Sequence, residues 1–155
     1  MCGALLAMTS PKKHIQKNNM KVSWIFEGDL LSVELEAPTK GWVGIGFNVR
    51  PELPGSYLLM GHVVAGKAQV MEHHTLALGD YRPITELGAE ARVKHVSGAE
   101  SGGKTTIRFS VPIAADSPCV HELSEGRKLT LHMAYSREDD FQHHSMMRTA
   151  VQITL

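Results

Sequence analysis

The sequence predicts an all-β fold, a two-sheet antiparallel β-sandwich of about nine strands. Apolar residues recur at every second position, as in Leu31, Val33 and Leu35, and not with the period of a helix. Alternation of this kind buries one face of a strand and leaves the other face in water. Turn residues such as Gly28-Asp29 separate the runs. No stretch of ten or more residues has an amphipathic helical pattern.

Each expected strand is bounded by turn residues. The first two, 22–27 and 30–37, flank Gly28-Asp29, and Pro38 to Gly41 separates them from the third. The strand after Gly98 to Gly103 alternates Ile107, Phe109 and Val111 with polar residues, and the run that follows Gly126 alternates in the same way. The complete set of expected strands is 22–27, 30–37, 41–48, 57–64, 68–75, 91–97, 104–112, 127–135 and 147–155.

Length and composition predict one folded domain. The 155 residues fit one domain, and 43% hydrophobic with 21% charged residues excludes a disordered chain. Sixteen basic residues balance sixteen acidic ones, so we expect no nucleic-acid partner. Residues 1–20 begin with a short apolar patch and continue as a polar segment, which we interpret as a leader or a signal-peptide remnant. The sandwich is then expected to occupy 21–155.

The segment from Gly98 to Thr105 matches the phosphate-binding pattern G-x-x-x-x-G-K-[ST]. That loop needs a following helix, whose N-terminal N–H groups hold the phosphates. Here Lys104 opens an alternating, β-branched run that ends in a proline, which is typical of a strand. We therefore predict a hairpin loop that binds no nucleotide.

Soft metal ligands are the unusual feature of the composition. Nine His and eight Met stand beside only nine Phe, Trp and Tyr residues. Met60 and His62 are spaced i, i+2 in an expected strand, so their side chains point the same way. His143 and His144 precede the last strand, where a loop would aim one ring at a cofactor. Such a thioether and imidazole set suits haem iron or copper.

The segments Gly41-Trp-Val-Gly-Ile-Gly-Phe47 and His143 to Leu155, in this order, resemble the DOMON family. The resemblance implies an immunoglobulin-like β-sandwich outside the cytoplasm, periplasmic or secreted, that binds b-type haem or a small ligand such as a sugar. In haem-binding members a methionine before a central strand and a histidine before the last strand hold the iron. His144 matches the histidine, whereas Leu53 stands at the methionine position, and Met60 is the nearest thioether.

Two functions follow as expectations. The first is an electron-transfer cytochrome b module, with His144 and Met60 as axial ligands and a redox protein or membrane cytochrome as partner. Of the adjacent residues His143 and His144, we expect only His144 to face the pocket between the sheets, with Asp139 or Asp140 accepting a hydrogen bond from its ring. The second is a haem-free module for a small molecule, a sugar or a protein.

A copper site remains a minor alternative. It would use Met60, His62, His143 or His144 as metal ligands. None of these readings makes the chain an enzyme by itself.

Overall fold

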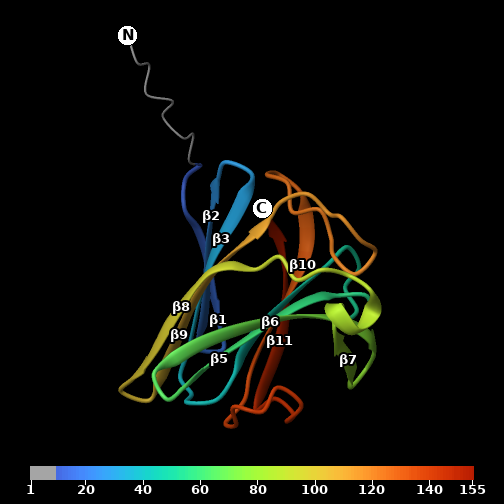
Figure 1. Cartoon of the computed structure of the whole chain (residues 1–155). Coiled ribbons are helices and arrows are strands. Elements are labelled where there is room, and N and C mark those ends of the chain that lie inside the picture. Colours follow the sequence, from blue (N-terminus) through green and yellow to red (C-terminus); the bar gives the residue numbers. More distant parts are fainter. Residues whose placement is uncertain (1–9) are drawn as a thin grey trace.

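In the computed structural model, which describes residues 10–155, two antiparallel sheets pack face to face (Figure 1). The first sheet has five strands in the order β1-β2-β3-β9-β8. Its strands are β1 (Lys13–Lys17), β2 (Met20–Glu27), β3 (Leu30–Ala37), β8 (Lys94–Ser101) and β9 (Lys104–Pro112).

The second sheet has six strands in the order β11-β10-β4-β5-β6-β7. Its strands are β4 (Val43–Asn48), β5 (Tyr57–Val64), β6 (Lys67–Ala77), β7 (Asp80–Pro83), β10 (Lys128–Tyr135) and β11 (Met147–Thr154). A single 3-10 turn, η1 (Ile84–Leu87), follows β7 within the described chain. No helix in residues 10–155 is long and apolar enough to cross a membrane.

The core lies between the two sheets and follows the period-two pattern. In β3, Leu31 and Leu35 are fully buried, while the alternate residues Ser32 and Glu34 face outward and are partly exposed. In β4, by contrast, all six residues are buried, so this strand is covered on both faces. A strand buried on both faces needs a second layer of packing outside the sandwich, and that layer forms the candidate site.

All nine expected strands are present, and the all-β sandwich prediction is confirmed. The structure adds two strands, β1 and β7, which are edge strands of the two sheets. Both are short, and neither carries the alternating apolar run that predicts a strand. Ile15 is the only large apolar residue of β1, and β7 is four residues long and ends in Pro83.

The expected leader over residues 1–20 needs correction. Its second half forms β1, which pairs with β2 from Lys13 opposite Trp24 to Lys17 opposite Met20. The segment has no alternating apolar pattern, because four of the five residues of β1 are exposed to solvent. The possible signal-peptide remnant in residues 1–9 lies outside the described residues.

The phosphate-loop look-alike is a tight β-hairpin. Strand β8 continues to Ser101, and β9 starts at Lys104, so only Gly102 and Gly103 form the turn. Their φ angles of 61° and 77° are both positive, as a two-residue type I′ turn requires. No helix follows to present N–H groups to a phosphate.

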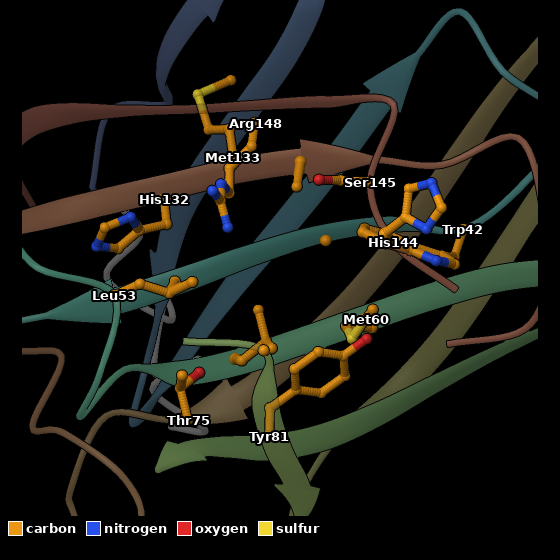
Figure 2. A pocket seen from close by; sticks show the side chains of 14 residues that line it. Trp42, Leu53, Met60, Thr75, Tyr81, His132, Met133, His144, Ser145 and Arg148 are labelled. Carbon is orange, nitrogen blue, oxygen red and sulfur yellow. The ribbon is translucent and has the colours of Figure 1, made fainter. Parts of the chain in front are cut away.

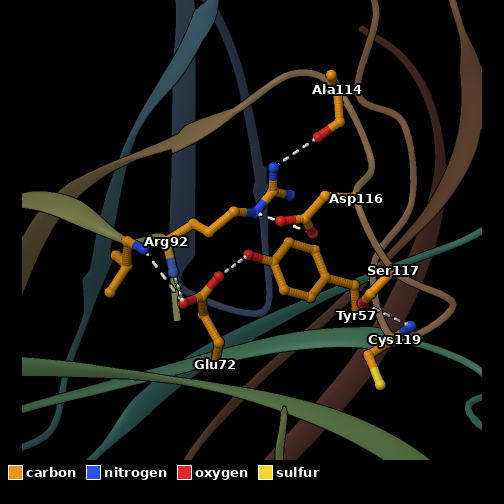
Figure 3. Close-up of polar contacts among 8 residues, drawn as sticks. Tyr57, Glu72, Arg92, Ala114, Asp116, Ser117 and Cys119 are labelled. Carbon is orange, nitrogen blue, oxygen red and sulfur yellow. Dashed lines mark hydrogen bonds and ion pairs between the residues drawn. The ribbon is translucent and has the colours of Figure 1, made fainter. Parts of the chain in front are cut away.

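One polar cluster is buried in the sandwich (Figure 3). The Glu72 carboxylate accepts a hydrogen bond from the Tyr57 hydroxyl and bonds from the backbone N–H groups of Arg92, at 2.6 Å, and Val93, at 3.1 Å. The Arg92 guanidinium pairs with Asp116 at 3.3 Å. Burial, and then the Glu72 charge, raise the pKa of Tyr57, so its hydroxyl stays a donor. The cluster ties the segment before β8 to the six-stranded sheet.

Replacing Lys104 by alanine tests the hairpin interpretation. Lys104 is exposed and pairs with Glu36 at 3.1 Å, so we expect the free energy of unfolding to change by no more than about 0.5 kcal/mol. Isothermal titration of the parent with magnesium–ATP is expected to give no heat of binding. Micromolar ATP binding that Lys104→Ala abolishes would contradict the prediction.

Removing the buried Glu72 carboxylate should lower the free energy of unfolding far more than removing the Tyr57 hydroxyl that it binds. Glu72→Ala leaves two backbone N–H groups and the Tyr57 hydroxyl without their acceptor, and we expect a loss of about 3–5 kcal/mol. Tyr57→Phe leaves the backbone hydrogen bonds to Glu72 in place, and we expect it to lower the free energy of unfolding by about 1–2 kcal/mol. Urea denaturation of both variants measures the difference. Equal costs for the two variants would show that the carboxylate is not the centre of the cluster.

Candidate functional site

Two glycines hollow the outer face of the six-stranded sheet. Along β4, Val43, Ile45 and Phe47 face the core between the sheets, so Gly44 and Gly46 face outward. A Cβ atom at Gly44 would lie 3.3 Å from Cγ of Met60, and one at Gly46 would lie 3.5 Å from Cβ of His132. The missing side chains therefore let Met60 and His132, from the two neighbouring strands, approach β4 closely.

A cavity of about 140 Å³ lies over this part of the sheet (Figure 2). Its walls come from β4, β5, β6, β7 and β10, from the β4–β5 loop, and from the chain that follows β10. They are mostly apolar, with a few polar groups. The lining residues are Trp42, Gly44, Leu53, Leu58, Met60, Thr75, Gly79, Tyr81, His132, Met133, Ala134, His144, Ser145 and Arg148.

Met60 and His144, which the sequence proposed as a ligand pair, line this same cavity. Met60 is on β5 and is 1% exposed. It packs in a second apolar cluster with Trp42 and Phe141, separate from the main core. His144 belongs to the loop between β10 and β11 and is exposed. Figure 2 shows its ring beside Trp42, at the end of the cavity that also holds Met60.

The expected location of the pocket was wrong. We expected His144 to point between the two sheets, but the cavity is on the outer face of one sheet. The reason is visible in β5, where Leu59 faces the main core, whereas Met60 belongs to the outer cluster. Alternation shows that Leu59 and Met60 face opposite ways, but it does not show which face the partner sheet covers.

The prediction that the rings of His143 and His144 point to opposite sides was also wrong. Their rings stack, with centroids 4.6 Å apart and planes at 20°. The prediction assumed extended backbone, whereas this loop turns, with the His143 N–H bonded to the Asp140 carbonyl at 3.0 Å. His144 lines both this cavity and a neighbouring hollow, and His143 lines only the hollow. Within residues 10–155, no hydrogen bond joins the His144 ring to Asp139 or Asp140.

His62 lies on the same sheet face as Met60, as the spacing predicted, but its ring does not line the cavity. Its Nδ1 is 2.7 Å from the Asp139 carbonyl oxygen, and because a carbonyl only accepts, Nδ1 donates. Its Nε2 is 3.3 Å from Oε1 of Gln69. The four residues considered for copper therefore do not converge on one point. Among residues 10–155, no three His, Cys, Asp or Glu side chains gather as a metal site.

Several cavity residues were missed. His132 on β10 is only 8% exposed, and it donates from Nε2 to the Glu52 carbonyl at 3.1 Å. Burial lowers the pKa of His132, and the charge of Arg148 lowers it further. Arg148 also lines the cavity. Tyr81 comes from β7, an edge strand without a sequence signal. The glycines of β4 were the available clue, because they mark where side chains on neighbouring strands find space.

The buried histidines around the site are held neutral. His73 is 1% exposed, on β6, with its ring edge-on to Tyr81 and Phe141. Burial lowers the pKa of His73 from 6.5 to about 4, although its bond to the Met71 carbonyl works in the opposite direction. Burial also lowers the pKa of His132, and it raises the pKa of Tyr81. This side of the sheet is therefore an apolar environment near neutral pH.

The fold and the matched segment identify the family. The family model of the DOMON domain matches residues 16–136, so the chain belongs to the DOMON family. The matched region includes β4 and β5 with Met60. It ends before the loop that carries His143 and His144.

Two curated relatives are similar in sequence. A mouse protein named DBH-like monooxygenase protein 2 is 28% identical over 145 residues, which is 88% of this chain and 22% of that protein. A Drosophila melanogaster protein named MOXD1 homolog 2 is 25% identical over 92 residues, 59% of this chain and 12% of that protein. The chain thus spans less than a quarter of the length of either relative.

Two solved structures share the fold. The cytochrome b domain of pyranose dehydrogenase from Coprinopsis cinerea superposes with a TM-score of 0.70 at 9% identity, covering 91% of this chain and 80% of that one. The cytochrome domain of cellobiose dehydrogenase from Myriococcum thermophilum gives 0.64 at 10% identity, covering 93% and 81%. At these identities the likeness establishes the fold alone.

The buried His73 makes stability depend on pH. The folded-state pKa is about 4 and the unfolded value is 6.5, so between these pH values the unfolded chain holds a proton that the folded protein lacks. The free energy of unfolding should therefore fall as pH drops from 6.5 towards 4, by at most about 3 kcal/mol from this residue. His73→Phe should reduce that loss.

Urea denaturation at pH 7.0 and pH 4.5 measures the effect. Some pH dependence is expected to remain in His73→Phe, because burial also lowers the pKa of His121 and His132. The exposed residue His14 provides the control, His14→Phe. An equal loss of stability in the parent and in His73→Phe would contradict the assignment.

Proposed function

We propose that this DOMON domain is an electron-transfer module that binds haem b on the outer face of its six-stranded sheet. The observation that supports the proposal most directly is that Met60 and His144 line one cavity. A methionine thioether and a histidine imidazole are a known pair of axial haem ligands. These two residues are 84 positions apart in sequence, and only the fold brings them together.

The surroundings suit an apolar macrocycle with a polar edge. Trp42, Leu53 and Leu58 give flat and aliphatic walls. At the end of the cavity away from Met60, Arg148 and His132 provide the polar groups, and Arg148 is an exposed cation able to pair with a carboxylate (Figure 2). The donor set and the lining therefore fit haem b.

The volume sets a condition on this fit. A cavity of about 140 Å³ is below the range of about 300–1,000 Å³ usual for small-molecule sites. Haem would therefore need more space than this cavity gives. Outward movement of the loop that carries His144 would provide that space. His144 is exposed on that loop, so such a movement costs little packing at the histidine itself.

When bound, the haem would supply one-electron transfer. Met60 and His144 would hold its iron, and the apolar walls would exclude water from the site. We propose that the domain performs no chemistry alone and passes electrons to a redox protein or a membrane cytochrome. We further propose a place outside the cytoplasm, in keeping with the family resemblance.

A second candidate, a haem-free module for a small apolar molecule, is favoured by two observations. Leu53 lines the cavity and stands where the resemblance places a methionine ligand. The cavity volume also matches a ligand much smaller than haem. Both candidates use the same site and differ in what occupies it.

Titration of the purified protein with haemin tests the first candidate. We expect a Soret band with the sharp visible bands of low-spin, six-coordinate iron. His144→Ala and Met60→Leu should each abolish the low-spin spectrum, because each removes one axial ligand. His143→Ala is the matched control and should keep the spectrum, because its ring lines only the neighbouring hollow.

The results also separate the two candidates. Two results together would favour the haem-free module. The protein would give no shifted Soret band with haemin, and it would bind a small apolar dye that a variant with a bulky residue at Gly44 does not bind. A low-spin spectrum that survives His144→Ala would contradict the role of His144. One that survives Met60→Leu would place the second ligand elsewhere.

A further inference from the structure

The loop of residues 137–146, here called the strap, crosses the outer face of the six-stranded sheet beside the cavity. It contains only bends and turns between β10 and β11. Its two ends are fixed by the backbone: the Trp42 N–H donates to the Glu138 carbonyl at 2.9 Å, and the Met146 N–H donates to the Tyr135 carbonyl at 2.8 Å. Between these points, side chains of the sheet hold it.

Three side-chain donors from three parts of the sheet each hold one strap carbonyl. Trp42, directly before β4, donates from Nε1 to the His143 oxygen at 3.1 Å. His62 on β5 donates from Nδ1 to the Asp139 oxygen at 2.7 Å. The Tyr81 hydroxyl on β7 donates to the Phe141 oxygen. None of these bonds belongs to the ladder of the sheet, so the strap can lift while every strand stays paired.

Phe141 is the side chain that the strap inserts against the sheet. It is 9% exposed, although Gln142 and His143 beside it are exposed. Its ring stacks on His62, with centroids 4.2 Å apart and planes at 18°. It also packs in the cluster that contains Met60 and Trp42. Phe141 therefore helps to cover Met60 on the side facing solvent.

A closed strap accounts for both the burial of Met60 and the small volume of the cavity. Met60 has a reactive thioether in a candidate ligand site, but it is 1% exposed. The cavity above it, about 140 Å³, is small for any drug-sized ligand. Moving Phe141 and the strap away would enlarge the space and uncover the thioether, and it would require no change in the sandwich.

We propose that Tyr81 and His62 are positioning residues that latch the strap, and that opening of this latch controls access of a ligand to Met60. The part of the proposal that concerns a ligand rests on the proposed function of the cavity. The latch also places His144, because the same strap carries it. Neither Tyr81 nor His62 needs to touch the ligand to act in this way.

Oxidation by hydrogen peroxide measures access to Met60 without any ligand. Peroxide transfers one oxygen to a thioether and leaves water, and the sulfoxide is counted in peptides by mass spectrometry. The chain carries two internal references. Met146 is 45% exposed and should react quickly, whereas Met133 is 0% exposed in the main core and reports loosening of the whole sandwich.

Two variants remove one latch bond each and keep the ring that packs. Tyr81→Phe removes the hydroxyl, and His62→Phe removes Nδ1 while keeping a ring to stack on Phe141. We expect each to raise the rate of Met60 oxidation about five- to tenfold, the size of effect for the loss of one hydrogen bond. The rate at Met133 should not change. Tyr135→Phe is the matched control, because Tyr135 donates to no strap carbonyl within residues 10–155.

The outcomes decide the latch and the ligand separately. Met60 oxidation that is as fast as that of Met146 in the parent, or unchanged in both variants, would overturn the latch. A rise that Met133 shares would show general loosening and would overturn it as well. For the parent and variants that bind haemin, stopped-flow mixing should show faster association in His62→Phe, because His62 does not line the cavity. An unchanged rate would overturn control of access. If neither the parent nor any variant binds haemin, only the haem proposal is contradicted. The latch is still tested by the rate of Met60 oxidation, which needs no haem.

Discussion

The candidate site depends on a steric constraint in β4, where glycine alternates with large apolar residues. Val43, Ile45 and Phe47 fill the core between the sheets. Gly44 and Gly46 leave the other face of the strand without side chains, and Met60 and His132 on the neighbouring strands lean into that space. A larger residue at Gly44 would meet the Met60 side chain first. The same strand therefore packs large side chains inside the sandwich and borders the cavity outside it, at Gly44.

The cover of this hollow is held differently from the rest of the fold. Strands are joined by ladders of backbone hydrogen bonds, which break only when a strand separates. The strap is held in its middle by indole, imidazole and phenol groups and by the burial of one aromatic ring. Such contacts break one at a time, and this gives the segment a lower opening cost than any strand beneath it. A binding site needs that local freedom in an otherwise rigid protein.

Polar groups are buried on both faces of the six-stranded sheet, and the two sets behave differently. In the core, Glu72 has three donors and ties the chain before β8 to the sheet. On the outer face, His73 and His132 are kept neutral by burial, each with one ring nitrogen bonded to a backbone carbonyl. The core set adds stability through satisfied hydrogen bonds. The two histidines of the outer set add no charge to the surroundings of the cavity near neutral pH.

The sequence alone determined the sandwich and the nine longer strands, and with the family resemblance it singled out Met60 and His144 as candidate ligands. Alternation every second residue is a local signal, and buried strands carry it strongly. Strands β1 and β7 were not predicted, because they are five and four residues long and carry no alternating apolar run. Only the tertiary structure decided that the cavity lies outside the sandwich, that the rings of His143 and His144 stack, and that His62 holds a carbonyl. These features depend on which face of a strand the second sheet covers and on the path of a turning loop. Both are set by contacts between residues far apart in the chain, and no local pattern records them.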